Sequence, residues 1–419
     1  MPVADGREEI VQAYADYVSP GKVASYRTYD MVFVPEKRNG CYIRDMNGRR
    51  LINCHSNGGV FNLGHRNRRI IAAVAAAMKT YDIGNHHLIS KPKAALARRI
   101  AGLMPPGLDQ VVYGVGGGEA IDLAIKLARG VTGRAEIISA RGGYHGHTGF
   151  ALAAGDKKFK EKFRPMPPGF RQVPFNDIAA LEKSISKKTA AVIFETIPAT
   201  LGIVVPDKKY FQSLRKLCDR VGALFILDEV QTGFARTGPL WGFENFHTVP
   251  DIVVLGKGMS GGIYPISATV YNRKYRQFFT DDPFLHISTF GGSEIGCCAA
   301  LEALEISADK EFQDAVAWMG IYFRGAFESL AARYPAAGMK IRGIGLMMGL
   351  EFVDDVTSLM MMKLLFDNGV YVVYSGNDMK VLQFLPPLIV TEREGGEIVA
   401  ALEKSLKALT GAGKQGSVR

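Results

Sequence analysis

The sequence has no pair of cysteines in the C-x-x-C spacing. An odd number of scattered cysteines forms neither the framework of a disulfide-rich domain nor that of a zinc site: Cys41, Cys54, Cys218, Cys297 and Cys298. The first 21 residues, MPVADGREEIVQAYADYVSPG, lack the apolar core of a secretory leader. The expected location is therefore the reducing cytoplasm.

Long hydrophobic runs and concentrated charge are also missing. The apolar run IIAAVAAAM at 70–78 is too short to span a bilayer, so no membrane partner is expected. Lys and Arg exceed Asp and Glu by 51 to 41, but the basic stretches at 65–69 and 157–164 are short and mixed. They do not form the basic stripe of a nucleic-acid-binding protein, and no nucleic-acid partner is expected.

What is present is an ordinary globular composition, with 47% hydrophobic and 22% charged residues in a chain of 419. From about residue 110 to 300, β-branched runs alternate with helical patterns, which predicts an α/β fold with a mostly parallel sheet. Helices are expected over Ala120–Arg129 and from Pro206 to Val221, the second ending at Gly222. Strands are expected at 111–113, 136–139, 190–194, 223–227, 251–255 and 266–271.

The two ends of the chain read differently. The segment GCYIRDMNGRRLINC predicts a hairpin that turns at Asn47-Gly48. The last hundred residues mix helices with the run VLQFLPPLIV. We expect a smaller α+β domain built from 1–55 and 306–419, which flanks a large domain over 56–305.

The stretch VVLGKGMSGG holds Lys257 between two glycines after an apolar strand, and three roles are open to it: a phosphate contact, a covalent catalyst or a solvated turn residue. The phosphate-binding loop G-x-x-x-x-G-K-[ST] fails, because position 251 is aspartate and position 258 is glycine. The dinucleotide fingerprint G-x-G-x-x-G fails at Glu119. The triplet Gly116–Gly118 still suits a phosphate at a helix start, or simply a tight turn.

Asp228 ends a fully apolar strand, one strand before Lys257 in the sequence. A buried carboxylate needs a cation or a hydrogen-bond donor, and capping of the next helix is the alternative role. Ligands of open α/β sheets bind beyond the carboxyl ends of the strands, where both side chains are expected. Pyridoxal phosphate requires such a lysine for its Schiff base and an aspartate for its ring nitrogen, and Tyr144 offers a ring to stack on it. His145 and His147 lack a matching third ligand, so no metal site is expected.

The chain resembles the class III, or ω-type, aminotransferases, which are pyridoxal 5'-phosphate enzymes of fold type I. The segments that carry the resemblance are NLGH, EAIDLAIKLAR, YHG, LDEVQTGFARTG, LGKGMSGG, STFGGSE and FLPPLIVT. The resemblance implies that Lys257 forms the Schiff base and moves the proton, and that Asp228 pairs with the ring nitrogen. It also implies transfer of an amino group from an amine or amino acid to a keto acid or aldehyde.

The resemblance further implies how the chain holds the cofactor. Gly117 and Gly118 offer backbone N–H groups to the phosphate, and Val230 packs on the ring face opposite Tyr144. Gln231 lies near the ring hydroxyl. Thr289 is similar to a threonine that reaches the phosphate of a neighbouring subunit, which implies a homodimer with shared active sites.

Three positions depart from the family pattern. Gly116 and Gly118 replace residues that carry hydroxyl groups, Thr200 stands where many members have a glutamate, and Gln383 stands where many have a carboxylate-binding arginine. Loss of that arginine removes a bidentate clamp, so a donor other than a standard glutamate-type substrate is expected. A racemase or epimerase with the same cofactor and lysine is the alternative activity.

Overall fold

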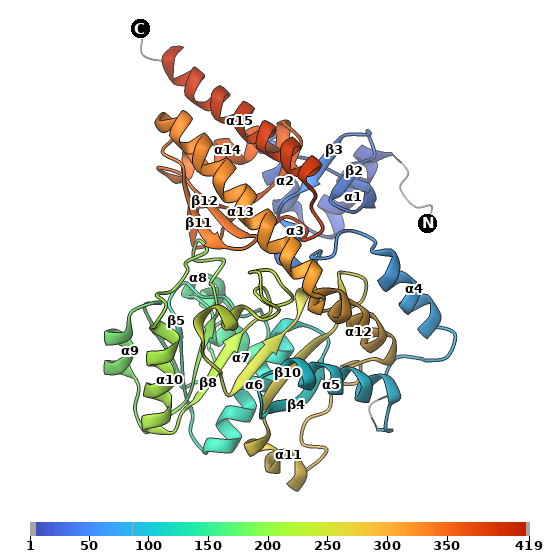
Figure 1. Cartoon of the computed structure of the whole chain (residues 1–419), viewed down its shortest axis with the longest axis vertical. Helices are drawn as coiled ribbons and strands as arrows, with labels where there is room; N and C mark the ends of the chain where they lie inside the picture. Colours follow the sequence, from blue (N-terminus) through green and yellow to red (C-terminus); the bar gives the residue numbers. More distant parts are fainter. Residues whose placement is uncertain (1–5, 86, 416–419) are drawn as a thin grey trace.

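The computed structural model describes residues 6–85 and 87–415, and of 412–415 the backbone alone. A seven-stranded sheet fills the lower half of Figure 1, and both ends of the chain lie in the upper half. The strand order is β4-β10-β9-β8-β7-β5-β6, in which β10 runs antiparallel to both neighbours and the other pairs are parallel. The predicted α/β class and mostly parallel sheet are confirmed.

All six predicted strands are present, within a few residues of their expected ends, and β6 was not predicted. The strands of the large sheet are β4 Leu108–Gly114, β5 Glu136–Ala140, β6 Phe170–Val173, β7 Thr189–Glu195, β8 Leu224–Asp228, β9 Ile252–Leu255 and β10 Ser267–Asn272. The smaller strands are β1 Pro35–Asn39, β2 Tyr42–Asp45, β3 Arg50–Asn53, β11 Lys340–Ile344, β12 Met347–Glu351, β13 Val370–Tyr371, β14 Val373–Ser375 and β15 Asp378–Phe384.

Helices cover both faces of the large sheet. They include α5 Lys91–Leu103, α6 Gly117–Thr132, α7 Gly149–Ala154, α9 Ile178–Ser184, α10 Tyr210–Val221, α11 Gln277–Asp281 and α12 Glu294–Ala308. Successive residues of β8 point to opposite faces: Phe225 and Leu227 join the core beneath α5, α10 and α12, whereas Leu224 and Ile226 join the core beneath α6 and α7. Burial on both faces explains the unbroken apolar runs of these strands.

The predicted helix around Ala120 is confirmed, with its apolar stripe fully buried. The predicted start at Pro206 is wrong, because α10 begins at Tyr210. The intervening residues form a turn, in which Asp207 donates its N–H to Asn176 and Tyr210 donates to the Asp207 carbonyl. Gly222 ends α10 in the left-handed region, at φ 70°, as predicted.

The two ends of the chain pack together around two four-stranded sheets, β1-β2-β3-β13 and β11-β12-β15-β14. The predicted hairpin is β2 and β3, whose turn is held by the Asp45 carboxylate accepting from the N–H groups of Asn47 and Arg49. Helices of this part are α1 Arg7–Tyr17, α2 Pro20–Thr28, α13 Lys310–Arg333, α14 Asp355–Asp367 and α15 Glu392–Gln415. The remaining α-helices connect other elements and are α3 Ser56–Gly59, α4 Arg68–Ala77 and α8 Lys157–Lys160.

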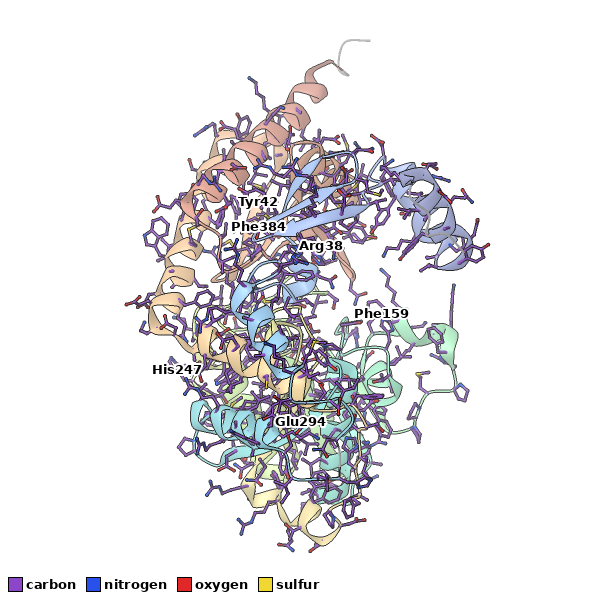
Figure 2. The ribbon with its side chains drawn as sticks, turned by 90° about the vertical axis from the view of Figure 1, so that its right-hand side faces the viewer. Arg38, Tyr42, Phe159, His247, Glu294 and Phe384 are labelled. Atoms are coloured by element: carbon purple, nitrogen blue, oxygen red, sulfur yellow. The ribbon has the colours of Figure 1, made fainter. Side chains whose placement is uncertain are left out.

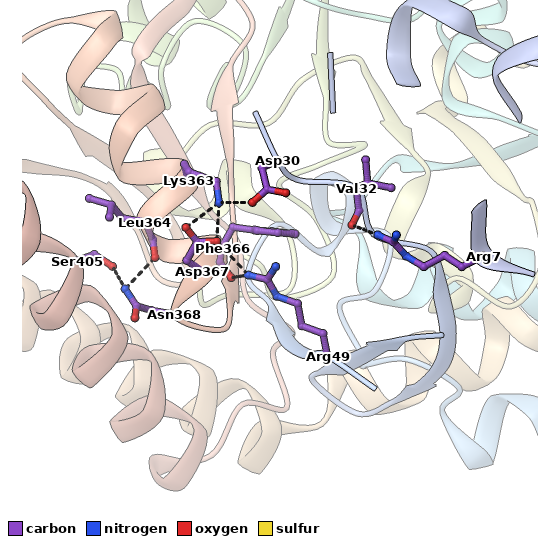
Figure 3. Close-up of polar contacts among 10 residues, drawn as sticks. All are labelled: Arg7, Asp30, Val32, Arg49, Lys363, Leu364, Phe366, Asp367, Asn368 and Ser405. Atoms are coloured by element: carbon purple, nitrogen blue, oxygen red, sulfur yellow. Dashed lines mark hydrogen bonds and ion pairs between the residues drawn. The ribbon is translucent and has the colours of Figure 1, made fainter. Parts of the chain in front are cut away.

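One hydrophobic cluster joins both ends, from Leu51 on β3 to Phe323 on α13 and Leu402 on α15. Figure 3 shows polar contacts across the same junction: Arg49 donates to the Phe366 carbonyl at 2.7 Å, and Lys363 lies 3.3 Å from Asp30. These contacts support a smaller domain made from both ends, although its proposed bounds of 1–55 and 306–419 stay a prediction. No helix of the described residues is long and apolar enough to cross a membrane.

Candidate active site

Lys257 is separated from the end of β9 by Gly256 alone and is the first residue of a short 3-10 helix, Lys257–Ser260. Its backbone has φ 41°, a left-handed conformation that costs a residue with a side chain about 1–3 kcal/mol and that tends to occur at functional sites. The Lys257 Nζ donates to Gln231 Oε1 at 2.7 Å. Burial lowers the pKa of the Lys257 amine, although the carboxylates of Asp228 and Glu195 oppose that shift. A larger neutral fraction makes this amine a better nucleophile and proton acceptor.

Asp228 ends β8 and is 6% exposed. One carboxylate oxygen accepts from the Val230 N–H at 3.0 Å, and the other lies 2.8 Å from His145 Nδ1. Burial by itself lowers the pKa of His145, but the hydrogen bond and charge of Asp228 outweigh it and raise the pKa above its ordinary value. The buried His145 ring and the Asp228 carboxylate therefore hold each other in place.

His145 is the residue of this site that the sequence prediction missed. The pattern YHG placed it beside Tyr144, but nothing in the sequence showed that its imidazole would bond to Asp228. The neighbouring His147 is exposed and contacts the edge of the Tyr144 ring, with centroids 5.4 Å apart. Among the described residues, no group of three or more metal-ligating side chains comes together.

A cavity of about 160 Å³ brings most of the predicted residues together. Its lining comprises Gly117, Gly118, Tyr144, His145, Gly146, Glu195, Ile197, Asp228, Val230, Gln231, Thr232 and Lys257. The Tyr144 ring packs edge-on against Phe159 of α8, which Figure 2 labels. The Tyr144 N–H donates to Glu195 at 2.8 Å, and burial raises the pKa of that carboxyl to about 7.

The glycine triplet forms the start of α6. The first N–H groups of any α-helix lack intrahelical partners. Gly116 is the N-cap of α6 and makes no side-chain capping bond, so it leaves these N–H groups available. A Cβ on Gly117 would lie 3.2 Å from a Val230 methyl group, which shows how closely the backbone approaches the side chain on the cavity wall. The free N–H groups and the helix dipole suit an anion here.

Thr289 does not reach this cavity within the chain. It lies in the loop between α11 and α12, where its carbonyl approaches Gly84. A second cavity of about 310 Å³ shares Gly117 and Lys257 with the first. The described residues therefore leave a second open space beside Lys257.

Thr200 and Gln383, two of the positions that depart from the family pattern, bond to backbone carbonyls. Thr200 Oγ1 donates to the Gly142 carbonyl at 3.2 Å, and the buried Gln383 side chain donates to the Ala199 carbonyl at 3.4 Å. Asn377 Nδ2 donates to the same Gly142 carbonyl at 2.7 Å. The lining of the first cavity includes no arginine, and Lys257 is its one lysine among the described residues.

The residues present fit pyridoxal phosphate. Gln231 Nε2 is buried and has no hydrogen-bond partner among the described residues, so it can donate to a ring oxygen beside Lys257. Asp228 supplies a charged acceptor for a ring nitrogen, and Tyr144 and Val230 offer surfaces for the ring. The start of α6 supplies donors for the phosphate.

Comparisons with known proteins agree with this chemistry. The family model described as Aminotransferase class-III matches residues 24–406. An uncharacterised aminotransferase from Archaeoglobus fulgidus is 48% identical over 93% of this chain and 92% of its own length. The putrescine aminotransferase of Pectobacterium atrosepticum is 33% identical over 96% of this chain and 90% of its own.

Solved structures show the same fold. The ornithine aminotransferase of Toxoplasma gondii ME49 superposes with a TM-score of 0.88 at 27% identity, over 97% of this chain and 96% of that one. A pyridoxal-phosphate-bound amine transaminase from an uncultivated Pseudomonas species gives a TM-score of 0.83 at 27% identity, over 91% and 96% of the two chains. These relatives are transaminases, so they do not favour the racemase alternative. The chain belongs to the class III aminotransferase family, and its cofactor is pyridoxal phosphate.

Proposed function

We propose that this aminotransferase takes its amino group from a donor without an α-carboxylate, such as a primary amine or diamine, and passes it to a keto acid or aldehyde. The observation that carries the proposal is the charge of the side chains that line the first cavity, around Lys257. Its described lining offers a carboxylate substrate no arginine, and its one lysine is Lys257. The Glu195 carboxyl lies in the same wall, and with its pKa raised by burial to about 7 it adds no positive charge for an anionic substrate.

The chain's residues divide the chemical work. When bound, pyridoxal phosphate supplies an aldehyde carbon for the amine and a conjugated ring that stores an electron pair. Asp228 keeps a proton on the ring nitrogen, and His145 holds Asp228 in place. The amine of Lys257 takes the proton from the substrate carbon and returns it to the cofactor carbon, for which its lowered pKa suits it. Gln231 orients that amine through its 2.7 Å hydrogen bond.

The relative from Pectobacterium atrosepticum supports an amine donor, since its name gives putrescine as a substrate. The fixed positions of Thr200 and Gln383 support it as well. Both side chains are neutral and bond to backbone carbonyls, so neither offers a charge to an arriving carboxylate.

A donor screen tests this proposal. Purified holoenzyme is mixed with one donor at a time, without acceptor, and loss of the cofactor's absorbance above about 400 nm is followed. We expect putrescine or another primary amine to react at least about 100-fold faster than L-glutamate, the difference that one charge-assisted bidentate contact makes. The variant Gln383→Arg is expected to raise the L-glutamate rate, whereas the uncharged control Gln383→Met is not.

Efficient turnover of L-glutamate by the wild-type enzyme, at rates comparable to those of amines, would contradict the proposed donor. An absorbance that persists while solvent deuterium enters the substrate carbon would instead indicate racemisation.

We further propose a homodimer in which Thr289 completes the partner's site. Support comes from the open second cavity beside Lys257 and from the exposed apolar side chains around Thr289, which a second copy would cover. These side chains are Phe284, Leu285, Ile287 and Phe290, each at least 48% exposed.

A cytoplasmic location is proposed as well, since all five cysteines are free thiols.

Mixed dimers test the shared site. Lys257→Ala chains are expected to be inactive by themselves, and Thr289→Val chains are expected to bind the cofactor weakly. After co-expression, the hybrid dimer contains one site with both residues intact. We expect activity at limiting cofactor to exceed that of either parent several-fold. Activity no higher than that of the diluted Thr289→Val parent would place Thr289 outside the partner's site.

A further inference from the structure

The Thr148 side chain lies against the backbone of Gly118, at the start of α6. A Cβ built on Gly118 would be 2.8 Å from Thr148 Oγ1 and 3.3 Å from its methyl carbon. Gly146 approaches the same point, since a Cβ there would lie 2.9 Å from the Gly118 Cα. The hydroxyl of Thr148 therefore occupies space that a side chain at 118 would otherwise take.

We propose that the Thr148 hydroxyl donates a hydrogen bond to the cofactor phosphate and so replaces the side-chain hydroxyl that Gly118 lacks. Both Gly118 and Gly146 line the cofactor cavity, and Thr148 follows Gly146 by two residues. Its hydroxyl lies beside Gly118 in the first turn of α6, whose N–H groups would donate to the same phosphate. Phosphate oxygens accept such a bond strongly because they are charged.

The local structure gives Thr148 no competing role. It is the N-cap residue of α7, yet its side chain makes no capping bond to that helix. Threonine at an N-cap usually accepts from the second or third residue of its helix. Here the side chain is turned toward Gly118 instead. The proposal concerns the cofactor alone and does not depend on which donor the enzyme uses.

Cofactor titration of the full-length apoenzyme tests the proposal without an activity measurement. Thr148→Ala is expected to raise the Kd for pyridoxal phosphate about tenfold, near the lower end for one hydrogen bond to a charged group. Thr148→Ser keeps the hydroxyl and is expected to stay within about twofold of wild type, as is the control Thr132→Val at the far end of α6. Pyridoxal, which has no phosphate, is expected to bind wild type and Thr148→Ala equally.

A second pair of variants separates the hydroxyl from general packing. The backbone of Gly118 is helical, so serine fits there once Thr148 is shortened. In Gly118→Ser/Thr148→Ala, the new hydroxyl is expected to restore most of the lost affinity for pyridoxal phosphate. Equal weakening of pyridoxal and pyridoxal phosphate binding by Thr148→Ala would overturn the proposal, and so would an unchanged Kd for pyridoxal phosphate in that variant.

Discussion

Replacing Lys257 by alanine is expected to lower the rate of amino transfer by at least about 10⁴-fold, the upper range for loss of a positioned general base. The loss is large because one amine has two tasks. In the proposed mechanism it binds the cofactor covalently, and it moves the proton between the substrate carbon and the cofactor carbon. The neighbouring side chains are engaged in other contacts. Gln231 does not titrate, and Asp228 is held by His145 and the Val230 N–H. The two oxygens of Glu195 accept from the N–H groups of Tyr144 and Ala199.

Two measurements accompany the rate. Borohydride reduction followed by peptide mass analysis is expected to place the cofactor on Lys257 in the wild-type enzyme and on no peptide in the variant. The matched control is Lys187→Ala, an exposed loop lysine, which is expected to keep both the label and the rate. A Lys257→Ala enzyme with more than a few per cent of the wild-type rate would show that another group moves the proton.

Much of this site was predictable because it depends on a rule about sheets. Asp228 ends β8, and Lys257 follows β9. These two strands are adjacent and parallel, so their carboxyl ends meet at one edge of the sheet. Tyr144 and Gly117 follow β5 and β4, whose carboxyl ends lie at the same edge. A side chain that directly follows a buried strand can therefore be placed from the sequence, without knowledge of the loops.

The contacts that come from loops were not predictable. His145 and Asp228 are 83 residues apart, and their bond depends on how the 141–149 loop crosses the end of β8. The same is true of Thr148 and Gly118, which meet only because that loop packs against the first turn of α6. The predicted start of α10 at Pro206 was wrong for a related reason. A hydrogen bond from Asp207 to Asn176, which is far away in sequence, favours a turn after Pro206. Such long-range pairings have no local periodicity.

The aspartate at the end of β8 is expected to matter almost as much as the lysine. Asp228→Asn keeps the size of the side chain and its acceptor for the Val230 N–H, but it removes the charge. The ring nitrogen then loses the partner that holds its proton, and the ring stores the electron pair less well. We expect kcat to fall by about 10²- to 10⁴-fold, while the fold and the attachment to Lys257 persist.

The state of His145 changes in the same variant. Asp228 is the main group that raises the pKa of His145 against the effect of burial. Without the carboxylate, we expect the effect of burial to lower the pKa of His145. Proton NMR of the imidazole, in wild type and Asp228→Asn, measures this change. His145→Gln is the matched variant: it keeps the carboxylate and is expected to lose only about tenfold in kcat, as for one hydrogen bond to a charged group.

A cofactor analogue separates the charge of Asp228 from its shape. N-methylated pyridoxal phosphate carries a permanent positive charge on the ring nitrogen and needs no partner to keep a proton there. Loaded into Asp228→Asn, it is expected to recover at least about tenfold of the lost rate, because the missing function is electrostatic. In the wild-type enzyme the methyl group would crowd Asp228, and the rate is expected to fall. Equal slow rates with both cofactors in Asp228→Asn would mean that Asp228 acts by positioning the ring, since a fixed charge would then have made no difference.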